Sequence, residues 1–339
     1  MKALVLKSPG NLVLTEIPGL PPPPEGWALV RVRRIGVCGT DIHAYNGNQP
    51  FFSYPRILGH ELGVEIVQVA ENARGLNQGD LCSVEPYLNC GRCIACRRGK
   101  ENCCTSLQVL GVHVDGGQRE FLHVPTAKLH GSRRLSLDQL ALVETLGIGA
   151  HAVNRAAVEA GETVLVIGAG PIGMAVIQFA AAAGARVIAM DVNKARLAFC
   201  RDTLGVEDTL NASESDVLAD VQRLTDGDLP TAVFDATGNP QSMMGSFAFP
   251  AHGGRLVFVG LFQGDVTFSD PGFHKRELTL MGSRNARSED FTRIIGLIES
   301  GTIDTTPWIT HRAPFADVPT RFQEWVKPGA GVLKAMIDL

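Results

Sequence analysis

The sequence lacks an excess of positive charge. Its 31 Lys and Arg residues are outnumbered by 35 Asp and Glu residues, which gives a net charge of -4 and a pI near 6.1. Proteins that bind nucleic acid or anionic membranes usually carry a basic surface. The sequence therefore predicts neither nucleic acid nor a membrane as a partner.

The sequence also lacks a long apolar segment. The apolar part of residues 1–10 is too short for a signal peptide. Residues 163–185 carry no charge, but Gly168, Gly170, Pro171 and Gly173 interrupt this stretch early, so a buried strand, a turn and a helix fit it better than a membrane span. No internal repeat or low-complexity linker is evident. We expect a cytoplasmic protein of one or two globular domains.

Eight cysteines are present, and in a chain of 339 residues without a secretion signal they favour metal binding over disulfides. Four of them follow the spacing Cys90-x2-Cys93-x2-Cys96-x7-Cys104. Four thiolates close a tetrahedral zinc site without an open position, and such a site is structural. A group of free thiols is the alternative. Cys103 is interpreted as a spare thiol, and Cys82 and Cys200 as packing residues.

A second metal site is predicted from three separate positions. They are Cys38, His60 and Glu144, a single carboxylate inside the apolar run 140–146. Thiolate, imidazole and carboxylate are the ligands that zinc accepts, and catalytic zinc keeps a fourth position open. Glu61 is an alternative carboxylate ligand, or a catalytic carboxylate just behind the metal. Asp41 is a candidate acceptor for the other ring N–H of His60.

Thr40 and His43 have two interpretations. They are a turn hydroxyl and a surface imidazole, or a proton relay in which the hydroxyl passes a proton to a histidine that titrates near neutrality.

The first part of the chain, residues 1–145, has many short β-type segments such as 28–32 and 63–69. Turn signals such as 46–48 and 77–80 separate them. This pattern predicts a small barrel-like β domain.

The second part begins with an apolar segment at 163–167, followed by Gly168-x-Gly170-x-x-Gly173, a helical stretch and a second strand that ends at Asp191. In this order the glycines indicate a dinucleotide-binding turn, where backbone N–H groups approach the pyrophosphate. Asp191 can accept hydrogen bonds from the adenosine ribose and would repel a 2′-phosphate, so NAD is favoured over NADP. Arg196 could stack on adenine or attract a phosphate.

Further strands are predicted at 208–210, 231–235, 255–259 and 278–281, separated by helices near 193–204, 216–225 and 239–249. This alternation predicts a doubly wound sheet of about six parallel strands. A helix with an N-cap at Ser288 and a final strand at 331–337 that rejoins the first domain are expected after it. The candidate cofactor-binding residues are Gly168, Gly170, Pro171, Ile172, Gly173, Asp191, Arg196, Thr237, Val259, Gly260, Leu261, Ser283 and Arg284.

With these motifs assembled, the whole chain resembles the zinc-dependent medium-chain dehydrogenase/reductase family, and most of all its sorbitol, threonine and sugar-acid dehydrogenase branch. The resemblance implies a GroES-like catalytic domain (1–150, completed by 285–339) and a Rossmann domain (151–284). It also implies zinc on Cys38, His60 and either Glu61 or Glu144, a relay through Thr40 and His43, and dimers or tetramers. Relatives usually carry proline after the carboxylate, where this chain has Thr145.

The activity expected is hydride transfer between NAD and a secondary alcohol, such as a polyol, a sugar acid or threonine, with zinc as Lewis acid. Tyr45, His113 and Arg284 are possible pocket residues that favour polyhydroxylated or acidic substrates. The alternatives are a zinc-free quinone-type reductase and a non-catalytic dinucleotide sensor on the same fold.

Overall fold

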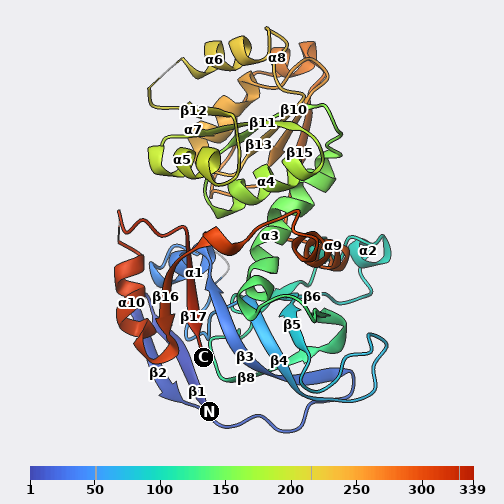
Figure 1. Cartoon of the computed structure of the whole chain (residues 1–339), viewed down its shortest axis with the longest axis vertical. Helices are drawn as coiled ribbons and strands as arrows, with labels where there is room; N and C mark the ends of the chain where they lie inside the picture. Colours follow the sequence, from blue (N-terminus) through green and yellow to red (C-terminus); the bar gives the residue numbers. More distant parts are fainter. Residues whose placement is uncertain (50–51, 215, 328) are drawn as a thin grey trace. The chain divides into compact units, whose positions relative to one another are not determined.

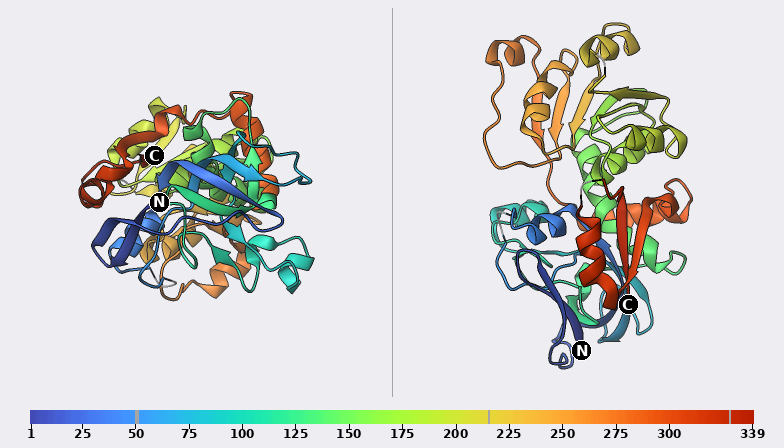
Figure 2. Two further views of the ribbon diagram at one scale, coloured as in Figure 1. Left: turned by 90° about the horizontal axis from the view of Figure 1, so that it is seen from below. Right: turned by 90° about the vertical axis from the view of Figure 1, so that its left-hand side faces the viewer.

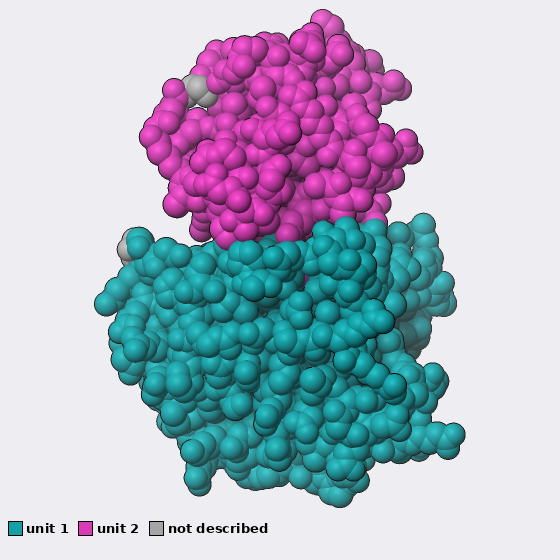
Figure 3. Space-filling view, in the orientation of Figure 1, with its two compact units in different colours: residues 1–145, 287–339 teal, residues 146–286 magenta. Residues whose placement is uncertain are grey.

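A computed structural model describes residues 1–49, 52–214, 216–327 and 329–339. The chain forms two compact units, shown in different colours in Figure 3. Unit 1 contains residues 1–145 and 287–339, and unit 2 contains residues 146–286. In the described part of the chain, no helix combines the length and the apolar character that a membrane crossing requires.

Unit 1 is built on a seven-stranded sheet with the order β16-β17-β3-β4-β5-β9, in which β8 also pairs with β3. The central pair is antiparallel, and Ala28, Val30 and Val32 of β3 alternate into the core that Val64 and Ile66 of β4 also fill. The strands of this sheet are β3 (Trp27–Val37), β4 (Glu61–Val69), β5 (Leu81–Val84), β8 (Phe121–Pro125), β9 (Leu129–Gly131), β16 (Ile309–Pro314) and β17 (Lys334–Asp338). The predicted β-rich first domain is confirmed.

The chain's final strand lies beside its first long strand, as Figures 1 and 2 show. β17 pairs antiparallel with β3, so that Ala335 faces Val37. The predicted return of the C-terminal strand is therefore confirmed. This unit also contains two two-stranded antiparallel sheets, β1 (Lys2–Ser8) with β2 (Asn11–Glu16) and β6 (Tyr87–Leu88) with β7 (Gln108–Val109). Its α-helices are α1 (Gly39–Tyr45), α2 (Ile94–Arg97), α9 (Ser288–Glu299) and α10 (Val318–Trp325).

The predicted N-cap of α9 is wrong by one residue. Arg287 is the cap, and Ser288 is the first helical residue. Its hydroxyl donates instead to the buried carboxylate of Glu85. The hydroxyl of Ser288 therefore bonds to a residue far away in the sequence and does not cap the helix.

Unit 2 contains six parallel strands in the order β12-β11-β10-β13-β14-β15. All four residues of β13 are buried, as expected for a strand covered on both faces. The strands are β10 (Thr163–Ile167), β11 (Arg186–Asp191), β12 (Asp208–Asn211), β13 (Ala232–Asp235), β14 (Arg255–Phe258) and β15 (Thr279–Gly282). The helices are α4 (Pro171–Ala182), α5 (Lys194–Asp202), α6 (Val217–Leu224), α7 (Pro240–Gly245) and α8 (Asp270–Lys275), while α3 (Leu137–Ala156) contributes residues to both units.

This strand order is that of a doubly wound dinucleotide-binding sheet, so the predicted fold class is confirmed. In such sheets the order reverses between the first and fourth strands, here β10 and β13, and ligands bind beyond the carboxyl ends of the strands there.

Candidate functional site

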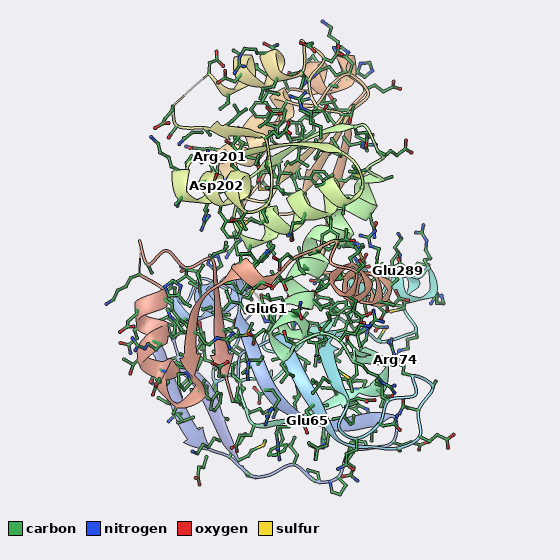
Figure 4. All side chains as sticks on the ribbon, in the orientation of Figure 1. Glu61, Glu65, Arg74, Arg201, Asp202 and Glu289 are labelled. Atoms are coloured by element: carbon green, nitrogen blue, oxygen red, sulfur yellow. The ribbon has the colours of Figure 1, made fainter. Side chains whose placement is uncertain are left out.

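Three potential metal ligands meet where β3 ends and β4 begins. Cys38 follows β3 and is the N-cap of α1, while His60 and Glu61 stand at the start of β4. The antiparallel register pairs Gly36 with Glu61, which brings the two strand ends together. One ligand atom from each of the three residues lies within 4.8 Å of the others. Figure 4 labels Glu61 in unit 1.

A glycine is required beside this carboxylate. A Cβ atom at Gly36 would lie 2.0 Å from Oε2 of Glu61. Any side chain at this position would therefore displace Glu61 from the group.

The imidazole of His60 is buried, with 5% of the residue exposed. Its Nδ1 lies 3.8 Å from Oδ1 of Asp41, and neither atom has a hydrogen-bond partner among the described residues. The other carboxylate oxygen of Asp41 accepts from the backbone N–H of Cys38 at 2.9 Å. Asp41 thus stands beside the imidazole, at a distance longer than a hydrogen bond.

Glu61 already has a cationic partner. The ammonium of Lys334, on β17, donates to its two carboxylate oxygens at 2.7 and 2.8 Å. It also reaches the hydroxyl of Thr145 at 3.2 Å and the carbonyl of Val37 at 3.3 Å. Glu61 and Lys334 are both buried, which makes this an ion pair shielded from water.

Glu144 has a neutral partner. Among the described residues it is outside the group formed by Cys38, His60 and Glu61, and its carboxylate accepts from the phenol of Tyr87. Burial, together with the charge of Glu144, raises the pKa of Tyr87 well above its ordinary value, so the phenol stays a donor. The negative charge of Glu144 is therefore not compensated by a direct ion pair.

Thr40 and His43 lie on α1, three residues apart and therefore on neighbouring positions of the helix surface. Thr40 is half-buried and His43 is exposed. Two of the possible pocket residues have local roles. The ring of Tyr45 packs in the core at 5.1 Å from Phe322, and Nδ1 of His113 accepts from the backbone of Val109 at 3.0 Å.

The four spaced cysteines converge in the loop around α2. Their sulfur atoms all lie within 4.8 Å of one another. Backbone N–H groups point at the sulfurs, from Cys90 to Cys104 at 3.3 Å and from Cys96 to Cys93 at 3.5 Å. The N–H groups of Cys96 and Thr105 lower the pKa of Cys93 to about 5. Cys103 is exposed and outside the group.

In unit 2 the three glycines form the turn between β10 and α4. Gly168 has φ +93°, and a Cβ on Gly173 would lie 1.7 Å from the carbonyl oxygen of Gly168. Gly170 is the N-cap of α4 and Pro171 is its first residue, with Ile172 next, which leaves N–H groups at the helix start free for an anion. Residues at Gly168 and Gly173 other than glycine would open this turn.

Asp191 closes the same turn from the end of β11. Its Oδ2 accepts from the backbone N–H of Ala169 at 2.6 Å, and its Oδ1 accepts from that of Asn193 at 2.7 Å. Each oxygen retains a second lone pair for a ribose hydroxyl. Arg196 comes within 3.7 Å of the position that a Cβ on Gly170 would occupy, so its guanidinium lies near the helix start.

The remaining cofactor candidates follow the next strands. Thr237 is held by the buried carboxylate of Asp235, which accepts from both its N–H, at 2.9 Å, and its hydroxyl, at 2.6 Å. A Cβ on Gly260 would lie 2.3 Å from the N atom of Gly238, so the turns after β13 and β14 are in contact. Val259 and Leu261 flank Gly260, and Ser283 and Arg284 follow β15; Leu261 and Arg284 are exposed.

The donor sets suit zinc at both places in unit 1. A thiolate, an imidazole and a carboxylate are the ligand types of a catalytic zinc, and four thiolates are those of a structural zinc. The unpartnered Nδ1 of His60 and the N–H groups directed at the cysteine sulfurs fit this interpretation.

Comparisons with known proteins agree with the geometry. Residues 24–133 match the family "Alcohol dehydrogenase GroES-like domain", and residues 171–300 match the family "Zinc-binding dehydrogenase". The chain is 43% identical to L-galactonate-5-dehydrogenase of Escherichia coli, over 99% of this chain and 98% of that protein. It is 34% identical to L-threonine 3-dehydrogenase of Bacillus licheniformis, over 95% of each.

A third relative is the 2-dehydro-3-deoxy-L-galactonate 5-dehydrogenase of Pseudoalteromonas atlantica, which is 32% identical over 93% of this chain and 92% of that protein. Among solved structures, the alcohol dehydrogenase RspB of Escherichia coli, complexed with cofactor NADH, superposes with a TM-score of 0.91 at 28% identity, over 100% of this chain and 99% of that one.

The chain belongs to the zinc-type medium-chain dehydrogenase/reductase family. It is an oxidoreductase with a GroES-like domain and a Rossmann domain, in the branch that contains sugar-acid, polyol and threonine dehydrogenases. The predictions of family, fold and alcohol dehydrogenase activity are confirmed. Nothing in the comparisons favours the quinone-type reductase or the non-catalytic sensor.

Two residues of this site were missed in the sequence. Lys334 could have been suspected, because it is a charged residue inside the otherwise apolar predicted strand 331–337. Tyr87 carries no comparable signal.

Proposed function

We propose that this protein oxidises the C5 hydroxyl of a six-carbon aldonic acid of the L-galactonate type, with NAD as hydride acceptor. The products are the 5-keto acid, NADH and a proton. The observation that carries this proposal is the 43% identity to an L-galactonate-5-dehydrogenase along nearly the whole length of both chains. The relative from Pseudoalteromonas atlantica is also named for oxidation at C5 of an L-galactonate derivative.

Our assignment of the catalytic zinc ligands is Cys38, His60 and Glu144. Distances alone favour Glu61, but its charge is already neutralised by Lys334. In the described part of the chain Glu144 is paired with a phenol and not with a cation, so its ionised form would balance a divalent cation together with the Cys38 thiolate. The structural zinc is assigned to Cys90, Cys93, Cys96 and Cys104.

Zinc supplies Lewis acidity toward the substrate hydroxyl, and NAD supplies the hydride acceptor. In this proposal the half-buried hydroxyl of Thr40 accepts the substrate proton, and the exposed imidazole of His43 releases it to water. Asp191 binds the adenosine ribose, and the turn from Gly168 to Gly173 binds the pyrophosphate through backbone N–H groups. The glycines of this turn have no Cβ atom that would keep the pyrophosphate away from these N–H groups.

The test is NADH formation by the zinc-loaded protein with L-galactonate, its C5 epimer, its 5-deoxy analogue, sorbitol and L-threonine. We expect turnover on L-galactonate, none on the 5-deoxy analogue, and about two zinc ions per chain. Cys38→Ser should abolish turnover and lower the zinc content to about one per chain. Cys200→Ser, a change of a buried thiol in unit 2, is the matched control and should leave both unchanged.

The second candidate function is oxidation of L-threonine, which the 34% identity to a threonine dehydrogenase supports. Turnover on L-threonine alone would favour it and would contradict the sugar-acid proposal. An active Cys38→Ser protein with both zinc ions would contradict the ligand assignment.

We also propose that the protein is a homodimer or homotetramer in which β15 contacts a second copy. β15 is an edge strand of the sheet in unit 2, and its residue Leu280 is an exposed large hydrophobic side chain. Unpaired edges of this kind pair readily with another strand. Leu280→Lys should therefore lower the molar mass measured by light scattering.

We further propose a cytoplasmic location, as the cysteines suggest. All eight cysteines are free, and four of them converge in one group. A reducing compartment keeps such thiols available for zinc.

A further inference from the structure

A pocket of about 650 Å³ lies in unit 1, apart from the metal groups. Its wall includes Arg74 from the loop after β4, the end of β9, the following loop with Arg133 and Arg134, and the outer side of α9. Figure 4 labels Arg74. None of its lining residues is a zinc ligand, a relay residue or a cofactor candidate of the proposed function.

This pocket is lined by more cationic hydrogen-bond donors than by carboxylates that could neutralise them. Arg133 and Arg134 are exposed, and no carboxylate partner of their guanidinium groups is found among the described residues. The two carboxylates of the wall are engaged locally. Glu299 accepts from the hydroxyl of Ser132 at 2.6 Å, and Asp80 accepts from the backbone N–H of Asn77 at 2.8 Å.

Arg74 is oriented by a buried histidine. Its Nη1 lies 3.4 Å from Nδ1 of His130, whose Nε2 lies 3.2 Å from Glu85. Burial lowers the pKa of His130, so the ring is neutral near pH 7. A neutral ring that donates to Glu85 through Nε2 has the lone pair of Nδ1 free to accept from Arg74. His130 is 3% exposed and stacks on Phe291 at 4.9 Å, which holds the ring in place.

The other two arginines extend from an ordered turn. The backbone N–H groups of Arg134 and Leu135 both donate to the hydroxyl of Ser132 at 3.1 Å. The N–H of Ser132 donates to the carbonyl of Leu81 at 3.1 Å, which ties this turn to β5. Two anchored segments therefore carry the three arginines that line the pocket.

We propose that this pocket is a second, non-catalytic binding site for a phosphate group, either free or carried as a monoester. A guanidinium group binds oxyanions through paired N–H donors. Because the three groups come from two separate loops, they suit a tetrahedral phosphate, whose oxygens point in several directions, better than a planar carboxylate. The volume leaves room for an organic group on the phosphate.

Calorimetric titration of the zinc-loaded, NAD-saturated protein tests this proposal, since bound NAD fills the pyrophosphate site. The probes are inorganic phosphate, glycerol 3-phosphate and acetate at constant ionic strength. We expect saturable binding of the phosphates, weaker by about tenfold or more in Arg133→Ala/Arg134→Ala. Arg321→Ala, an exposed arginine of unit 1 that pairs with Glu324 on α10, is the control and should bind as the wild type does. Unchanged melting temperatures would show that the variants fold.

Tighter binding of glycerol 3-phosphate than of inorganic phosphate would support the proposal and indicate a phosphorylated metabolite. Equal binding would support it with free phosphate as the ligand. Absence of binding, equal affinity in the double variant and the wild type, or acetate binding as tight as phosphate binding would each overturn it. Loss of dehydrogenase activity is a separate result, because the proposed function does not use this pocket.

Discussion

The replacement Lys334→Met tests the buried ion pair beside the proposed zinc. The ammonium of Lys334 holds both oxygens of Glu61 and is itself 2% exposed. Methionine has a similar length and no charge. The replacement therefore leaves the Glu61 carboxylate, which is fully buried, without its ammonium partner.

Removing one partner of a buried ion pair costs about 3–5 kcal/mol. Since each kcal/mol shifts the melting temperature of a unit of 150–250 residues by about 2–4 °C, the metal-free variant should melt roughly 6–20 °C below the metal-free wild type. In the zinc-loaded protein this difference should be smaller, because the metal places positive charge near Glu61 once Lys334 no longer occupies its carboxylate.

The assay is thermal unfolding with zinc and with a chelator. Chelation also removes zinc from the cysteine group, but it does so in wild type and variant alike. Glu61→Gln, combined with Lys334→Met, should restore most of the lost stability, because it removes the stranded charge. Lys327→Met changes an exposed lysine and serves as control. An equal loss with and without zinc, or no rescue by Glu61→Gln, would refute the reasoning.

Three further predictions concern other parts of the chain. Cys93→Ser should lose one zinc and stability on the order of several kcal/mol, while the control Cys103→Ser loses neither; intact zinc content in Cys93→Ser would count against the site. Asp191→Asn should raise KM for NAD about tenfold with little change in kcat, and it should reduce the preference of the enzyme for NAD over NADP. An unchanged KM for NAD would exclude a contact between Asp191 and the ribose. Burial lowers the pKa of His130, so the unfolded chain takes up a proton below about pH 6.5 and the folded protein does so only at a lower pH; stability is therefore lost as the pH falls through that range. The fall in melting temperature from about pH 7 to 5.5 should therefore be smaller in His130→Gln than in wild type or His123→Gln, and equal slopes would contradict this.

The parts of the protein that the sequence alone predicted depend on short-range spacing. The glycines at 168, 170 and 173 lie between a buried strand and a helix, and only a tight turn with little side-chain volume satisfies that order. The four cysteines from 90 to 104 likewise fall within one loop, whose length limits where their sulfurs can lie. The alternation of strands and helices from 163 onwards predicted a doubly wound parallel sheet for the same reason.

Only the tertiary structure decided which partners the buried charged groups have. Glu61 meets Lys334 across 273 positions of sequence, and Tyr87 meets Glu144 across 57. Strand register and packing bring these groups together, because a charge removed from water must find a partner wherever the fold supplies one. The sequence thus determined which residue types could bind zinc and NAD. The balance of charge around Glu61 and Glu144, on which the choice of ligand depends, came from long-range packing that local spacing cannot predict.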